Sequence, residues 1–177
     1  QVLRESWQAQ GTHWNMLGAS VTFTAAIEAV NRVYGTKYRP HAISKVAPTG
    51  SAHRAERDIA DLLNILPAYR TEREEWPFVQ YDLSGSTDVP LAIYGDSFAD
   101  QLRWAAMDSG FTHKDLCAYS SNAVPSYTMM ADILKNKKIF IMTWIDGNLF
   151  LYNDRINREI EQIFSNIREI KLQNVID

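Results

Sequence analysis

Cysteine, long apolar runs and an excess of basic charge are what this sequence lacks, and each absence excludes a class of protein. The 177 residues include one cysteine, Cys117, so no disulfide can form within the chain, and cysteine usage indicates no redox compartment. No apolar run reaches about 18 residues, so the sequence predicts no membrane-spanning helix. The first residues also lack the charged-then-apolar pattern of a secretory signal.

The charges are nearly balanced, with 18 Lys and Arg residues against 21 Asp and Glu residues. A nucleic-acid-binding domain would carry a basic patch, so we expect no nucleic-acid partner. The sequence has no cluster of His, Cys and Asp at metal-ligand spacing and no glycine-rich phosphate loop, so we expect no metal and no cofactor. With 46% hydrophobic and 22% charged residues, the composition is that of a globular protein and suits a single domain over residues 1–177.

Apolar residues recur at three- and four-residue steps in three stretches, which is the spacing of one buried helix face. From Asn15 to Tyr34 this pattern predicts an amphipathic helix that ends at Gly35. A second helix is predicted over residues 55–66. Residues 36–51, between them, have two prolines and no period, and we expect a loop there. Near the end of the chain, five isoleucines in alternating four- and three-residue steps predict an amphipathic helix over residues 155–172.

Two short apolar runs, at residues 89–94 and 138–145, are rich in β-branched residues and do not alternate with polar ones. This pattern predicts strands covered on both faces, as in parallel sheets. Helical patterns follow the first run at 98–110 and precede the second at 127–136, and residues 115–121 form a third candidate strand. Strands separated by such helices form right-handed βαβ units. We therefore expect an α/β fold with three layers, in which helices cover both faces of a sheet.

Ser97 follows the first of these strands, at or just before the start of a helix. In open α/β sheets the chemistry collects at the carboxyl ends of the strands. The N–H groups at a helix start can stabilise the oxyanion that forms when a serine attacks an ester, and Gly95 would allow a tight turn there. Ser97 is therefore a candidate nucleophile, although a serine at this position is also a favoured N-cap.

His13 is the best-placed base for such a serine. A serine hydroxyl is a poor nucleophile at neutral pH, and histidine has a suitable pKa for removing its proton. His13 precedes the first long helix, whereas the other three histidines lie in polar or loop-like stretches typical of surface residues. We expect His13 and Ser97 to lie within hydrogen-bond reach.

The segments "GDSF" at residues 95–98 and "THWN..GA" at residues 12–19 resemble motifs of the SGNH-hydrolase-like acetyltransferases of the alginate O-acetylation family, the AlgX and AlgJ type. Two weaker matches, "RDIADLLNIL" at residues 57–66 and "IFIMTWI" at residues 139–145, extend the likeness over most of the chain, from about residue 7 to residue 145. The resemblance implies an SGNH-hydrolase-like fold and an acyl-enzyme mechanism with Ser97 as nucleophile and His13 as base.

The resemblance also implies a periplasmic or cell-surface enzyme that transfers acetyl groups to hydroxyls of an exopolysaccharide. Its partners would be the polysaccharide substrate and a membrane-bound acyl-transfer protein. Family members usually carry more of the domain upstream of the histidine motif, so the chain is either a fragment or a short member. The sequence indicates neither the acetyl donor nor the oligomeric state.

Gly11 is where this sequence departs from the family. The family pattern is Asp-x-His-Trp, in which the aspartate orients the histidine, and loss of that role costs on the order of 10⁴ in kcat in serine proteases. Asp58 and Asp96 are candidate substitutes, and the sequence favours neither. An acetyltransferase, a carbohydrate acetylesterase with the same residues and a catalytically silent carbohydrate-binding module therefore all stay open.

Trp14 and Asn122 are further candidates for substrate binding. Trp14 offers a large rigid plane on which a sugar ring can stack, but it also suits a core position at the start of a helix. Asn122 follows the candidate strand at 115–121, and its side-chain amide could donate a hydrogen bond to the oxyanion, as an asparagine does in SGNH sites. An asparagine in a loop is also a common turn former.

Overall fold

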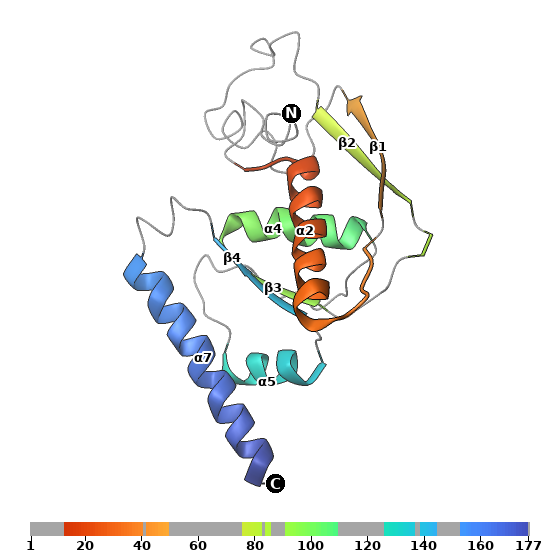
Figure 1. The fold of residues 1–177 in the computed structure, drawn as a ribbon. Coiled ribbons are helices and arrows are strands. Elements are labelled where there is room, and N and C mark those ends of the chain that lie inside the picture. The colour runs from red at the N-terminus through yellow and green to blue at the C-terminus, as the bar shows by residue number, and fades with distance from the viewer. Residues whose placement is uncertain are drawn as a thin grey trace. The chain divides into compact units, whose positions relative to one another are not determined.

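The computed structural model describes residues 13–40, 42–49, 76–82, 84–85, 91–109, 126–136, 139–144 and 153–176. The chain divides into two compact units, residues 1–88 with 100–112 and residues 89–99 with 113–177. The described residues form a mixed α/β structure with four helices and two sheets of two strands each (Figure 1). Among the helices of this described part, none is long and apolar enough to cross a membrane.

Helix α2, Met16–Tyr34, is the main helix of the first unit. The Gly18 N–H donates to the side-chain oxygen of Asn15 at 3.0 Å, which caps the helix start, and Gly35 ends it with a left-handed φ of 65°. Both ends are thus where the sequence predicts them. The buried face comprises Met16, Leu17, Ala19, Phe23 and Ile27. Tyr34, predicted to continue this face, is instead 76% exposed.

Strands β1, Ala42–Thr49, and β2, Trp76–Asp82, form an antiparallel ribbon in the same unit. The prediction of a loop over residues 36–51 is therefore wrong for the residues of β1. Pro48 of β1 pairs with Pro77 of β2. In a two-stranded ribbon each strand has an outer edge, where the missing N–H of proline removes no ladder hydrogen bond. Pro48, one of the two prolines that argue for a loop, is thus compatible with a strand.

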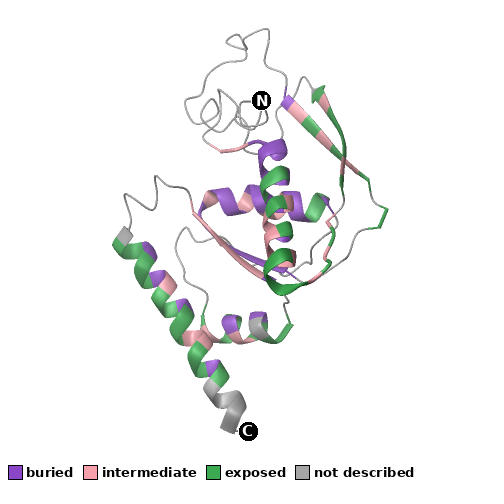
Figure 2. Cartoon of the chain, viewed as in Figure 1, coloured by how far each residue is buried: buried purple, intermediate pink, exposed green. Residues whose placement is uncertain are grey.

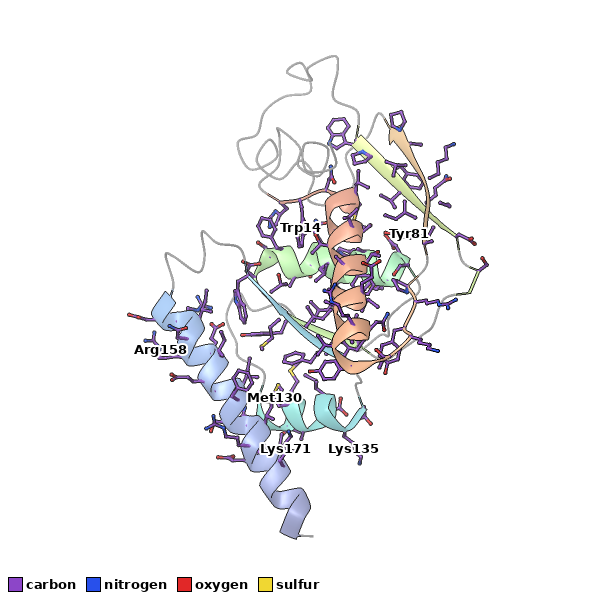
Figure 3. The ribbon with its side chains drawn as sticks, viewed as in Figure 1. Trp14, Tyr81, Met130, Lys135, Arg158 and Lys171 are labelled. Carbon is purple, nitrogen blue, oxygen red and sulfur yellow. The ribbon has the colours of Figure 1, made fainter. Side chains whose placement is uncertain are left out.

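Helix α2 packs on one face of β2. Side chains of β2 alternate in burial: Val79 and Tyr81 are half-buried, and their neighbours Phe78, Gln80 and Asp82 are exposed. The Tyr81 hydroxyl (Figure 3) lies 2.5 Å from Ser20 Oγ on α2. Since Ser20 Oγ donates its own proton to the Met16 carbonyl, Tyr81 is the donor in this pair. A partly buried polar pair therefore links helix and ribbon.

The second unit contains a parallel pair of strands, β3, Leu91–Gly95, and β4, Ile139–Thr143. Helix α4, Ser97–Asp108, follows β3 directly and begins in this unit, while α5, Tyr127–Asn136, precedes β4. The predicted strands, their parallel pairing and the flanking helices are confirmed. β3 is buried along its whole length, whereas β4 is half-buried after its first residue. The predicted helix at 55–66 and strand at 115–121 lie outside the described residues, and the described parallel sheet has two strands.

Helix α7, Asn153–Ile176, packs with α5 over one face of the parallel pair. Their shared core consists of Ala92, Tyr94, Met130, Ile133, Ile163 and Ile170. Figure 2 shows buried positions along one side of α7, and Figure 3 labels Met130 on α5. Ile156, Ile163 and Ile170 are buried, and Ile160 and Ile167 are half-buried. These five isoleucines, which we call the isoleucine seam, form the packed face of α7, as the sequence predicts.

Replacing Asn15 by alanine should destabilise the first unit by about 1 kcal/mol, because the cap of α2 is lost. Asn15 is fully buried, so no water can easily take the place of its side-chain oxygen. For a chain of this size we expect the melting temperature to fall by about 2–4 °C, measured by circular dichroism. Asn15→Ser keeps a capping oxygen and should lose only a few tenths of a kcal/mol. Equal losses in the two variants would contradict this account.

Candidate active site

The chain turns from β3 into α4 at Gly95, the last residue of the strand, and Asp96. Gly95 lies opposite Thr143 of β4, and a Cβ added to it would lie 1.8 Å from the Thr143 carbonyl oxygen. The Asp96 N–H donates to this same oxygen at 3.3 Å. Gly95 allows the chain to turn here without adopting a positive φ. It is needed because the two backbones approach closely at their carboxyl ends.

Asp96 caps helix α4. Its side-chain Oδ1 accepts a hydrogen bond from the Phe98 N–H at 3.0 Å, and its carbonyl oxygen accepts one from the Ala99 N–H at 2.9 Å. The side chain is 9% exposed, so its charge is held by these contacts and by the positive end of the helix. Asp96, and not Ser97, is therefore the N-cap residue.

Ser97 is the first residue of α4 and is half-buried. It follows the carboxyl end of a strand in a parallel pair, which is where open α/β sheets bind their ligands. Its N–H belongs to the first turn of α4, at the end of the helix where the aligned peptide dipoles place a partial positive charge. This position combines a short nucleophilic side chain with a partial positive charge, which is the combination that ester attack requires.

His13 and Trp14 lie in the first unit, directly before the cap of α2, and both are half-buried. The buried Asn15, which caps α2, follows them directly in the chain. Figure 3 labels Trp14. Ser97 belongs to the second unit, so its contact with His13 stays a prediction. Gly11 and Asn122 lie outside the described residues.

Asp58, the other candidate substitute for the missing aspartate, also lies outside the described residues. Asp96 is described, and its Oδ1 accepts from the Phe98 N–H. A carboxylate that caps a helix in this way has a structural role already, which makes it a poor candidate for orienting the His13 ring.

Glu159 is a buried residue near this turn that the sequence reasoning missed. Its Oε2 accepts a hydrogen bond from the Tyr94 hydroxyl at 3.1 Å, and its Oε1 accepts one from Arg155 Nε at 2.8 Å. Glu159 is 7% exposed although it lies on a highly charged helix. The feature of the sequence that could have identified Glu159 as buried is its spacing. It lies three residues after Ile156 and four before Ile163, which places it on the same helix face as these isoleucines.

Comparison with models of known protein families gives no match, and comparison with curated proteins gives none either. Within the residues that the structure describes, no group of three or more His, Cys, Asp and Glu side chains could hold a metal ion. The function is therefore argued from the turn after β3 and from the sequence motifs that flank it.

Gly95→Ala should destabilise the protein by about 3 kcal/mol, because the added methyl group collides with the Thr143 carbonyl and forces β3 and β4 apart. Gly35→Ala adds the same methyl group where no atom lies within 4 Å, and its left-handed backbone should cost only about 1–2 kcal/mol. Urea denaturation followed by circular dichroism measures both losses. If Gly95→Ala costs no more than Gly35→Ala, the close approach of the two strands is not a constraint on this turn.

Proposed function

We propose that the chain is an O-acetyltransferase that moves acetyl groups to hydroxyls of an exopolysaccharide. The observation that carries this proposal is the division of roles in the turn after β3. Asp96 caps α4, so the Ser97 hydroxyl at the helix start is not required as the cap. The resemblance of residues 95–98 and 12–19 to the SGNH-hydrolase-like acetyltransferases supports the same chemistry. The proposal includes that family's fold, a three-layer sheet with helices on both faces, and a single domain over residues 1–177.

In the first step of the proposed reaction, Ser97 Oγ attacks the carbonyl carbon of an acetyl donor while His13 takes the hydroxyl proton. The new C–O bond places a negative charge on the carbonyl oxygen. Collapse of this intermediate breaks the bond to the leaving group, which takes the proton from His13. In the second step, a sugar hydroxyl gives its proton to His13 and attacks the acetyl group. The ester bond to Ser97 breaks, and Ser97 Oγ recovers the proton.

The oxyanion in this reaction needs donors besides the turn itself. The N–H groups of Phe98 and Ala99 already donate to Asp96, and the Asp96 carboxylate is an anion in the same turn. Both facts weaken the positive potential that an oxyanion would meet at this helix start. A neutral side-chain donor avoids this conflict, so the proposal assigns Asn122 to the oxyanion and Trp14 to stacking on the sugar ring.

The proposal also includes a periplasmic or cell-surface location and a membrane-bound acyl-transfer protein as the source of acetyl groups. A carbohydrate acetylesterase is the nearest alternative, because water in place of the sugar hydroxyl uses the same residues. The departure at Gly11 favours a second alternative, a catalytically silent carbohydrate-binding module, since an unoriented histidine is a weak base.

Ser97→Ala should abolish hydrolysis of p-nitrophenyl acetate and the transient gain of one acetyl group on the protein, because no acyl-enzyme can form. Spectrophotometry and intact-protein mass spectrometry measure these two effects. Ser126→Ala is the matched control, since Ser126 is an exposed serine in the same unit. Its hydroxyl oxygen accepts from the Met129 N–H at the start of α5, so the variant should lose about 1 kcal/mol of stability but keep both the hydrolysis and the acetyl gain. Equal turnover by the Ser97→Ala variant and the unmodified protein, with polysaccharide binding intact, would favour the silent module.

Gly11→Asp should raise the esterase activity, by up to about 10⁴-fold if no other acid orients His13. The gain should vanish when His13→Ala is added, because the new carboxylate acts only through the imidazole. Steady-state kinetics of the two single variants and the double variant measure this dependence. A fall in activity in Gly11→Asp with the fold intact would show that position 11 does not correspond to the aspartate of the family pattern.

A further inference from the structure

We infer that Tyr94 and Glu159 are positioning residues for the turn that carries Ser97, an inference that rests on the proposed function. Neither residue belongs to the motifs read from the sequence. Tyr94 is fully buried in β3, three residues before Ser97, and Glu159 lies on α7. The hydrogen bond between the Tyr94 hydroxyl and Glu159 Oε2 joins the carboxyl end of β3 to that helix.

The Glu159 carboxylate is held on both of its oxygens. Burial of a charged group is unfavourable unless hydrogen-bonding partners replace the lost water, and Glu159 has Tyr94 on Oε2 and Arg155 on Oε1. Arg155 lies one helical turn earlier on α7 and is about half exposed. It supplies a positive charge to the buried carboxylate while its own side chain reaches solvent. The acceptor for the Tyr94 hydroxyl is therefore fixed in place.

The Tyr94 ring is also confined by packing. It belongs to the core formed with α5 and α7, and the ring of Trp144 meets it nearly edge-on, with an interplanar angle of 82° and ring centroids 5.9 Å apart. Trp144 directly follows the last residue of β4. With its ring packed and its hydroxyl bonded, Tyr94 has a single position relative to β4 and α7.

The position of the Tyr94 backbone affects that of Ser97 through the two residues between them, which are both held by contacts. Gly95 lies against the Thr143 carbonyl, and Asp96 donates to that carbonyl and caps α4. A displacement of the Tyr94 backbone would therefore alter the turn and the first residues of the helix together. Rates of this kind of chemistry are sensitive to displacements of about 1 Å, which can cost about 100-fold.

Tyr94→Phe and Glu159→Met both remove the hydrogen bond while keeping the side-chain bulk. Each should lower kcat for p-nitrophenyl acetate by about 10- to 100-fold and change KM less than about twofold, because the nucleophile is displaced and the substrate contacts are not. The double variant should be no slower than the slower single variant, since both changes break the same bond. Glu159→Gln keeps an acceptor for the tyrosine and should recover most of kcat.

Ile163→Val is the control for a merely structural effect. Ile163 is fully buried on α7 in the same core, and its shortening should lower the melting temperature without affecting the Tyr94 hydrogen bond. It should therefore leave kcat unchanged well below the melting temperature. If kcat falls in proportion to stability in all of these variants, the positioning role is wrong.

Amide hydrogen exchange separates this inference from the proposed function. The Phe98 and Ala99 N–H groups donate to Asp96, so in Tyr94→Phe and Glu159→Met they should exchange at least about 10-fold faster, while in Ile163→Val they should follow the change in global stability. Unchanged exchange at these two amides would overturn the positioning role whatever the activity. If the unmodified protein and Ser97→Ala turn over substrate equally, the proposed function fails, and the exchange rates still decide whether Tyr94 and Glu159 hold the turn.

Discussion

The close approach of two parallel strands at Gly95 and Thr143 is the constraint on which the rest of the candidate site depends. A side chain at position 95 would occupy the space of the Thr143 carbonyl, so the contact selects glycine for its size and not for its backbone freedom. Because the same carbonyl accepts the Asp96 N–H, the chain is held to β4 at the last point before α4 begins. The place where α4 begins, and with it the position of Ser97, follows from this contact.

A turn held in this way has to satisfy two electrostatic requirements that oppose each other. The first helical turn has backbone donors that need acceptors, and the Asp96 carboxylate meets that need at 3.0 Å from the Phe98 nitrogen. An N-cap of this kind contributes about 1 kcal/mol to stability. The same carboxylate opposes a second negative charge nearby, which is what ester attack at Ser97 would create. The carboxylate that stabilises the turn therefore limits how strongly the turn could stabilise an oxyanion.

Local signals in the sequence predicted the elements whose ends are fixed by neighbouring residues. Asn15 and Gly35 end α2 through their own side-chain chemistry and backbone preference, and the apolar runs of β3 and β4 required no knowledge of their partners. Strand β1 was missed because its structure depends on a ribbon with β2, which is distant in sequence, and because Pro48 within it and Pro40 just before it argue locally for a loop. At the site, the Ser97 motif was visible locally, whereas the role of Glu159 depends on Tyr94, 65 residues away in the chain.

The hydrogen bond between Tyr94 and Glu159 also determines the position of α7 along its own axis, which the isoleucine seam alone does not. Ile156, Ile163 and Ile170 recur every seven residues, so sliding α7 by seven residues would bring one isoleucine to the place of the next and preserve much of the apolar contact. The slide would move Glu159 away and bring residue 166, an asparagine, or residue 152, a tyrosine, to its place. Neither residue has a carboxylate to accept the hydrogen bond of the buried Tyr94 hydroxyl. A single buried polar pair thus fixes the register of a helix that apolar packing leaves ambiguous, and in this register Glu159 meets Tyr94, three residues before Ser97.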